Sequence, residues 1–265
     1  MAAILAALGS DYMKILTHAL LAGAMLFAPA TMAVAQDAEK AVSFTGGATF
    51  VSDYRFRGVS FSDKDIAVQG AMEMSTKPGF YVGLWGSSIA DFNGATAEVD
   101  LYAGWRGSAG PISLDAGILG YFYPGGTGTD IYELYGSIGG TVGPVGLKIG
   151  LNWAPDQGNL TGSSRYLYFG ANAGIPNTPI SVKGNLGFER GSLVVDETGS
   201  TTSKVDWLIG VDVKFEPLTI GLAYTDTDLP GNFAGVAPGI GVPLPGADAN
   251  SFSGGAFIVS LGVSF

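Results

Sequence analysis

The sequence predicts an all-β protein, a transmembrane antiparallel up-and-down β-barrel of about twelve strands behind an N-terminal signal peptide. Only 14% of the residues are charged, whereas soluble domains carry about 25%. No stretch beyond the N-terminal leader approaches the roughly 20 unbroken apolar residues that a membrane helix needs. Apolar and polar residues alternate instead, and short and long connections alternate along the chain. These features favour a membrane crossed by strands.

The N-terminal segment has the three parts of a secretory signal. Lys14 supplies the positive charge, a short apolar stretch follows, and Ala33-Val34-Ala35 form a small-x-small cleavage site. We therefore expect a signal peptide over 1–35, with Met13 as a second candidate start, and one barrel domain over 36–265. An uncleaved membrane anchor is the alternative, which the interrupted apolar stretch disfavours.

Period-two alternation continues to the C-terminal residue. In the stretch 204–215, Trp207 and Val211 share the apolar face, while Asp206 and Asp212 lie on the other. A membrane barrel turns the apolar face to lipid, whereas a soluble sheet turns it inward. The expected strands are 42–58, 66–75, 80–89, 97–107, 112–123, 131–141, 145–154, 165–175, 179–190, 204–215, 218–227 and 253–265.

The connections between these strands differ in length in a regular order. Five are short and contain a proline, which suits a tight turn because it fixes φ and lacks a donor. These are 76–79, 108–111, 142–144, 176–178 and 216–217. The longer ones are 59–65, 90–96, 124–130, 155–164, 191–203 and 228–252. Strict alternation of short and long is typical of outer-membrane barrels and has no cause in a soluble sandwich.

Aromatic residues are expected at both rims of the barrel, where a ring lies between lipid and water. The rim with the short turns would hold Phe44, Phe80, Trp105, Phe215 and Phe265. The other rim would hold Tyr54, Phe56, Phe122, Trp153, Phe188, Trp207 and Tyr224. The last strand ends in Phe265, which resembles the signal that the barrel-insertion machinery reads. An ordinary edge strand is the alternative.

The polar faces would line the lumen and carry both signs of charge. Two interpretations remain open: opposed charges pair and fill the interior, or they line a wet pore and set its selectivity. The candidate pore-lining residues are Asp53, Arg55, Arg57, Glu98, Asp100, Arg106, Glu133, Lys148, Lys183, Asp206 and Asp212.

Eight glycines also fall on the inward face. They either leave space for a pore or permit the strands to bend at closure. They are Gly83, Gly104, Gly117, Gly146, Gly150, Gly170, Gly187 and Gly210. The longer connections are rich in aspartate, which indicates either attraction of cations, a salt-tolerant surface, or contact with cations that bridge lipopolysaccharide.

Composition excludes several classes of function. The net charge of −10 argues against nucleic acid as a partner. The chain has no cysteine, and its one histidine, His18, lies in the expected signal peptide. Histidine-based catalysis and histidine or cysteine metal sites are therefore not expected. We expect no catalytic residue, no metal and no cofactor.

Several segments carry a family resemblance. The most specific is Tyr54-Arg55-Phe56-Arg57-Gly58, which is followed in order by Tyr121-Phe122-Tyr123-Pro124-Gly125 and Tyr132-Glu133-Leu134-Tyr135. Together they resemble the TorF-type family of proteobacterial porin-like proteins, from about Val42 to Phe265, although the second half matches by pattern more than by motif. The resemblance implies a porin-like barrel in the outer membrane and supplies no substrate or catalytic residue.

The resulting prediction is a passive diffusion channel for small hydrophilic solutes in the outer membrane of a Gram-negative bacterium, not an enzyme. Its expected partners are outer-membrane lipid, lipopolysaccharide, the barrel-insertion machinery through Phe265, and small solutes. The alternative from a different class is a closed barrel with a structural or surface-interaction role. A lumen filled by arginine–carboxylate pairs would favour that alternative.

Overall fold

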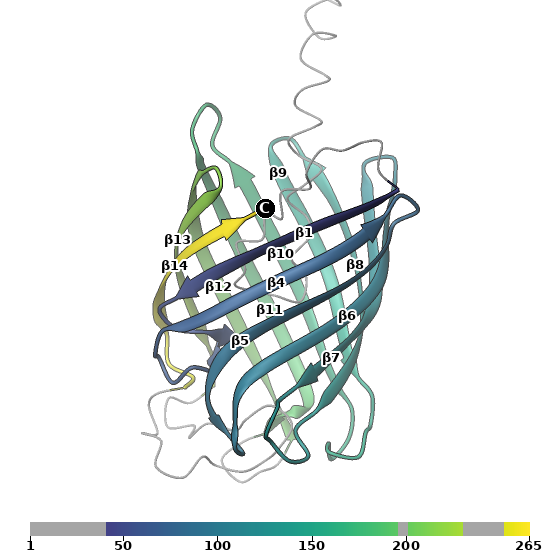
Figure 1. Cartoon of the computed structure of the whole chain (residues 1–265), viewed down its shortest axis with the longest axis vertical. Helices are drawn as coiled ribbons and strands as arrows, with labels where there is room; N and C mark the ends of the chain where they lie inside the picture. Colours follow the sequence, from purple (N-terminus) through teal and green to yellow (C-terminus); the bar gives the residue numbers. More distant parts are fainter. Residues whose placement is uncertain (1–40, 196–200, 230–251) are drawn as a thin grey trace, which may run out of the picture.

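Twelve antiparallel strands close into a barrel in the computed structural model, which describes residues 41–195, 201–229 and 252–265 (Figure 1). The predicted fold class is confirmed. The barrel strands are β1 (Val42–Val51), β4 (Ala67–Thr76), β5 (Phe80–Phe92), β6 (Ala95–Ala109), β7 (Ile112–Phe122), β8 (Ile131–Val142), β9 (Val145–Ala154), β10 (Ser164–Gly174), β11 (Ile180–Val195), β12 (Thr201–Phe215), β13 (Leu218–Thr227) and β14 (Ala256–Ser264). The expected signal peptide lies outside the described residues.

The barrel closes where the first strand meets the last. Ala48 of β1 faces Val263 of β14, and Val51 faces Ser260. On its other side β1 pairs with β4 along its whole length, from Val42 to Val51. Between these two strands the chain forms a separate two-stranded sheet from β2 (Arg55–Phe56) and β3 (Val59–Ser60).

The two ends of the barrel differ in their connections. One end, called the turn end here, holds the short connections and the outer ends of β1 and β14, at the top of Figure 1. The other is the loop end. The turn-end connections each contain the expected proline and span 77–79, 110–111, 143–144, 175–179 and 216–217. Short and long connections therefore alternate at most positions, as predicted.

Several of the expected strand boundaries are wrong at the loop end. β11 and β12 extend into the expected loop 191–203, to Val195 and from Thr201, and the last strand begins at Ala256 instead of residue 253. The first strand was expected to reach residue 58 but ends at Val51. The expected loop 90–96 is instead a continuation of β5 and β6 to a two-residue turn at Asn93-Gly94, with φ of 53° and 92°. Positive φ at both central residues is typical of a hairpin turn that matches the twist of its strands.

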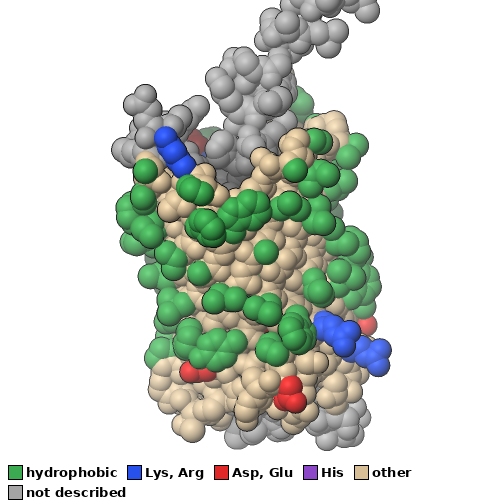
Figure 2. Space-filling model, turned by 90° about the vertical axis from the view of Figure 1, so that its right-hand side faces the viewer, with side chains coloured by type: hydrophobic (Ala, Val, Ile, Leu, Met, Phe, Trp, Pro, Cys, Tyr) green, Lys and Arg blue, Asp and Glu red, His purple; other side chains and the backbone are tan. Residues whose placement is uncertain are grey.

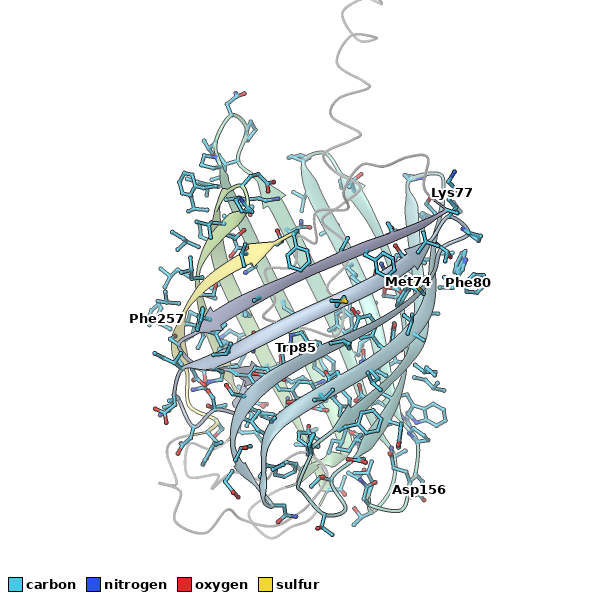
Figure 3. All side chains as sticks on the ribbon, viewed as in Figure 1. Met74, Lys77, Phe80, Trp85, Asp156 and Phe257 are labelled. Carbon is cyan, nitrogen blue, oxygen red and sulfur yellow. The ribbon has the colours of Figure 1, made fainter. Side chains whose placement is uncertain are left out.

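The apolar face of the wall points outward. Trp207, Val211 and Leu147 are exposed, whereas Asp206 is 3% exposed. Figure 2 shows hydrophobic side chains over this face of the barrel, with charged side chains toward its two ends. Figure 3 places Phe257 outside the ribbon. The predicted orientation, with apolar side chains outward and polar ones inward, is confirmed. Among the described residues, no helix is long and apolar enough to cross a membrane.

Five of the inward glycines each face a tyrosine on a neighbouring strand. A Cβ atom on any of these glycines would overlap the tyrosine ring. The ring therefore lies along the wall over the glycine instead of projecting into the lumen, an arrangement known to protect glycine in sheets. Four of the pairs are directly opposite in register: Gly83 with Tyr102, Gly104 with Tyr81, Gly117 with Tyr135, and Gly150 with Tyr168. In the fifth, Tyr166 reaches Gly187 diagonally.

We predict that Gly117→Ala lowers the free energy of unfolding by about 1–3 kcal/mol, the usual cost of overpacking. The added methyl group would meet the ring of Tyr135 and the carbonyl oxygen of Ala103. Gly170→Ala is the matched control, since it also faces inward and its nearest neighbour, Cβ of Lys148, lies 3.8 Å away. Urea unfolding of both variants in lipid vesicles measures the difference. Equal free energies of unfolding for the two variants would show that the position of the Tyr135 ring does not require glycine at residue 117.

Candidate functional site

The segment between β1 and β4 folds into the barrel at the loop end. Its hairpin turns at Arg57 and Gly58, which have φ of 48° and 84°. Such a turn needs positive φ at both central residues, and arginine rarely adopts it. The ring of Phe56 contacts Tyr121 of β7, at a centroid distance of 5.6 Å. The hairpin therefore reaches wall strands that are far from β1 and β4 around the barrel.

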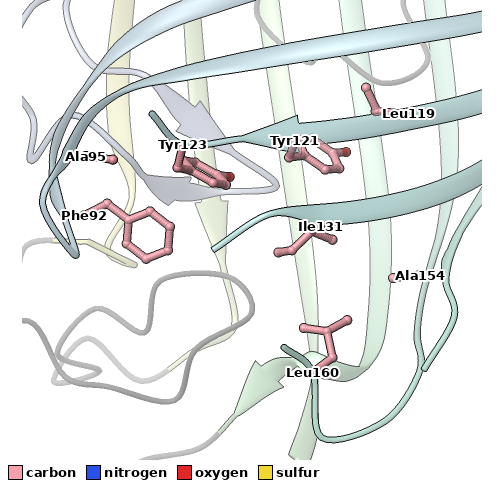
Figure 4. Close-up of a cluster of buried hydrophobic side chains, with 8 residues drawn as sticks. All are labelled: Phe92, Ala95, Leu119, Tyr121, Tyr123, Ile131, Ala154 and Leu160. Carbon is pink, nitrogen blue, oxygen red and sulfur yellow. The ribbon is translucent and has the colours of Figure 1, made fainter. Parts of the chain in front are cut away.

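Apolar side chains of this segment fill the interior at the loop end. Phe56 and Phe61 pack against two buried clusters, one around Trp85 of β5 and one around Tyr121 and Tyr123. Figure 4 shows the second cluster, with the pale blue hairpin next to its two tyrosines. Tyr54 and Phe56 were expected at the outer rim facing lipid. That expectation is wrong, because both belong to the segment inside the barrel and Tyr54 is 5% exposed.

The base of the hairpin is held by Arg55, which is fully buried. Its Nε donates to Oδ2 of Asp53 at 2.6 Å. Its Nη1 donates to the carbonyl oxygens of Phe252 and Gly254, at 3.1 and 2.8 Å. Ser60 donates to the other oxygen of Asp53 at 2.5 Å. Arg55 thus joins the hairpin to the chain that enters β14.

The tip of the hairpin is held by Arg57, which is bound from across the lumen. Its Nη2 donates to both carboxylate oxygens of Glu133 on β8, at 2.9 and 2.8 Å. Its Nη1 donates to Oε1 of Glu189 on β11 at 2.5 Å. The guanidinium carbon lies 4.3 Å from the ring centroid of Tyr166 on β10. Burial opposes the charge on Arg57, but Glu133 and Glu189 outweigh it and raise its pKa well above its usual value.

The two carboxylates are in turn held by neighbouring wall side chains. Tyr121 and Asn152 both donate to Oε2 of Glu133, at 2.9 and 2.8 Å. Lys204 pairs with Oε2 of Glu189 at 2.9 Å and donates to the carbonyl oxygen of Arg57 at 2.6 Å. Charges buried this deeply stay ionised only when paired and hydrogen-bonded. We call the wall side chains around this guanidinium the Arg57 cage: Tyr121, Glu133, Asn152, Tyr166, Glu189, Lys204 and Asp206.

A second acidic pair lies beside this cage on β6. Glu98 and Asp100 are 1% and 4% exposed. Both carboxyl oxygens of Glu98 and Oδ1 of Asp100 have no hydrogen-bond partner among the described residues. Within the described part of the chain neither carboxyl forms an ion pair with a basic side chain. The loop-end half of the interior therefore has more acidic groups than basic ones.

The half nearer the turn end is more open to water. Arg106 binds both carboxylate oxygens of Glu73, at 2.6 and 3.0 Å, and remains 24% exposed. Lys183 pairs with Asp212 at 2.8 Å and is 27% exposed. Lys148 lies 6.0 Å from the ring centroid of Tyr168. Polar side chains therefore line this part of the lumen and remain partly exposed.

The candidate residues divide into two groups by position. Asp53, Arg55 and Arg57 were expected on the wall, and this is wrong because they belong to the inserted segment. The others project inward from the barrel strands and are Glu98, Asp100, Arg106, Glu133, Lys148, Lys183, Asp206 and Asp212. A role in charge selectivity stays a prediction for all of them.

Sequence reasoning did not select Glu189, Lys204, Tyr166, Tyr121 or Asn152 as site residues. The alternation pattern places all five inward, but it does not show that they converge on one group. The described residues contain no group of three or more His, Cys, Asp or Glu side chains arranged to hold a metal ion. The expectations of no metal, no cofactor and no catalysis stay predictions.

We predict that Arg57→Ala lowers the free energy of unfolding by about 3–5 kcal/mol, because it leaves buried carboxylates unpaired. The matched control is Arg165→Ala, which removes an exposed arginine from the outer face of β10 and should change stability by less than about 0.5 kcal/mol. Urea titration in detergent micelles compares the two variants. A loss for Arg57→Ala no larger than that of the control would contradict the importance of the buried ion pairs.

Comparison with solved structures and protein families agrees with this fold. The NanC porin is similar with a TM-score of 0.56 at 9% identity, covering 83% of this chain and 99% of that one. The KdgM porin has a TM-score of 0.54 at 7% identity, with the same coverage. At such identity the likeness shows the porin-like barrel fold alone.

No curated protein matches the chain. The TorF-type resemblance stays a prediction. A family model matches residues 35–240, and the chain therefore belongs to Gcw_chp, a family of bacterial proteins of unknown function.

Proposed function

We propose that the chain is an outer-membrane channel for small hydrophilic solutes, which the β2–β3 hairpin closes at the loop end. The observation that carries this proposal is the direct pairing of Val51 with Ala67, the last residue of β1 and the first of β4. The wall is continuous at this point, so residues 52–66 are not needed to close the barrel. The segment that fills the loop end therefore lies outside the strand pairing that closes the wall. It can leave without opening the sheet once its own bonds to the wall break, such as those from Ser52 N to the Val259 carbonyl oxygen and from Ala90 N to the Phe61 carbonyl oxygen.

The outer face supports a location in the outer membrane of a Gram-negative bacterium. Apolar side chains cover the wall, and the longer connections gather at one end. In such barrels the short turns face the periplasm and the longer loops face outside. The proposed partners are membrane lipid, lipopolysaccharide and, through Phe265, the barrel-insertion machinery.

The interior supports passage of hydrophilic solutes. In the turn-end half, Arg106, Lys148, Lys183 and Asp212 are polar groups on a partly hydrated wall. The tyrosines that lie flat over their paired glycines add polar hydroxyl groups without crossing the lumen. We propose that these side chains bias the charge of solutes after the hairpin has moved.

A closed barrel with a structural or surface role is the second candidate. The ion pairs of Arg57 with Glu133 and Glu189 favour it, because they fill the interior at the loop end. The two candidates differ in whether the lumen conducts once the hairpin is absent.

We predict that replacing residues 52–66 with Asn-Gly gives a barrel with several-fold higher single-channel conductance than the natural chain. The dipeptide suits a two-residue hairpin and would connect Val51 to Ala67, which already pair. Asp63→Asn, at an exposed position of the same segment, is the control and should conduct like the natural chain. Measurements in planar bilayers over a range of salt concentration test this. A deletion variant that folds but passes no current would establish the closed barrel.

We also predict that a disulfide between the hairpin and the wall closes the channel reversibly. The chain has no natural cysteine, and a Cβ on residue 58 would lie 3.0 Å from Cβ of Asp206. A disulfide needs roughly 3.5–4.5 Å between these atoms, so the tip of the hairpin must move outward slightly to form it. In the Gly58→Cys, Asp206→Cys variant, oxidation should abolish openings and reduction should restore them. The single Gly58→Cys variant should not respond. Identical currents in both redox states would mean that the hairpin does not gate conduction.

A further inference from the structure

The Arg57 cage belongs entirely to the barrel wall. Its members lie on six adjoining strands, from β7 to β12, and none lies on the hairpin. The cage is therefore present whether or not the hairpin occupies the lumen. What it holds in this structure is one guanidinium group from the chain itself.

The geometry of the cage fits a guanidinium group in particular. Glu133 offers both oxygens to one nitrogen, and Glu189 takes the next nitrogen. Tyr166 lies against the cation at 4.3 Å. A planar group with several donors in a fixed fork matches two carboxylates and an aromatic ring better than a compact ammonium does.

The cage is also held in shape before any ligand arrives. Tyr121 and Asn152 fix the carboxylate of Glu133, and Lys204 fixes that of Glu189. The side chain of Asn152 is buried, and its Oδ1 has no hydrogen-bond partner in the structure. It leaves one further acceptor for a donor-rich ligand.

Charge makes an empty cage unfavourable. When residues 52–66 leave, Arg55 and Arg57 leave with them. Glu133 and Glu189 then lose the cation that pairs with them. The cage keeps three buried carboxylates, Glu133, Glu189 and Asp206, and one basic group, Lys204. Water replaces part of the lost stabilisation, and a cation of matching shape replaces more of it.

We propose that the Arg57 cage is a guanidinium-binding site of the channel, which Arg57 fills when the hairpin closes the lumen and a guanidinium-bearing solute fills when the hairpin leaves. This inference rests on the proposed channel function and names its solute class. Free arginine esters and arginine-rich peptides are solutes of this chemistry. The solute and Arg57 compete for the same carboxylates, so binding of the solute favours the open state.

Chemical rescue of the Arg57→Ala variant tests the site without measuring transport. The full chain is folded in detergent micelles, and its thermal unfolding is followed with millimolar guanidinium, with sodium and with tetramethylammonium, all as chlorides. Guanidinium should raise the unfolding temperature of Arg57→Ala by several degrees, because binding to the folded state stabilises it. The natural chain, whose cage is filled, should not be stabilised. If Arg57→Ala does not fold, the variant with residues 52–66 replaced by Asn-Gly serves, since it keeps the whole cage.

The matched control removes the carboxylates that bind the guanidinium. In Arg57→Ala combined with Glu133→Gln and Glu189→Gln, the rescue by guanidinium should disappear. An equal response to tetramethylammonium, or a response that survives in this combined variant, would overturn the assignment. The absence of any shift in a folded variant would overturn it too.

Bilayer recordings of the deletion variant separate this inference from the proposed function. Arginine methyl ester should block its sodium current at concentrations about tenfold lower than tetramethylammonium does, and Glu133→Gln should relieve the block. If the deletion variant conducts but arginine methyl ester does not block it selectively, the channel function stands and the guanidinium site is rejected. If guanidinium selectively raises the unfolding temperature but no current is seen, the site stands and the channel function is rejected.

Discussion

The ion pairs of Arg57 are the interaction on which the interior depends. One guanidinium on an inserted segment is bound by Glu133 and Glu189, which stand on different strands of the wall. Burying any one of these charged groups alone would cost free energy, and the ion pairs with the other two offset that cost. Lys204 extends the same network to the backbone of the hairpin. The hairpin stays in its position because Glu133 and Glu189 are ionised, and these two carboxylates stay ionised because the hairpin brings Arg57 to them.

The fold could be predicted from the sequence because its strands and turns are marked by residues that are close together in the chain. Alternation at period two identifies the strands, and a proline in each turn-end connection separates them in pairs. The Asn93-Gly94 turn carried an equally local signal, an asparagine followed by glycine, which the expected loop 90–96 did not use. Weighing that dipeptide would have extended β5 and β6 to their observed ends.

The inserted hairpin was not accessible in the same way. Residues 52–58 keep the strand alternation, so Tyr54 and Phe56 were expected to face lipid and Arg55 and Arg57 the lumen. Nothing in that pattern distinguishes a strand in the wall from a segment inside it, because the difference lies in contacts with Glu133 and Glu189 far along the chain. The pairing of inward glycines with tyrosines was missed for a related reason, since it depends on strand register.

The continuity of the wall behind the hairpin has a consequence for the order of assembly. Because Val51 already pairs with Ala67, the sheet between β1 and β4 is able to form while residues 52–66 are still outside in water. In that order of events the ionisable side chains of the loop end would remain hydrated during strand insertion and would lose water only at the last step, when the segment folds in. Assembly of the membrane part would then avoid a stage in which unpaired charges enter a dry interior.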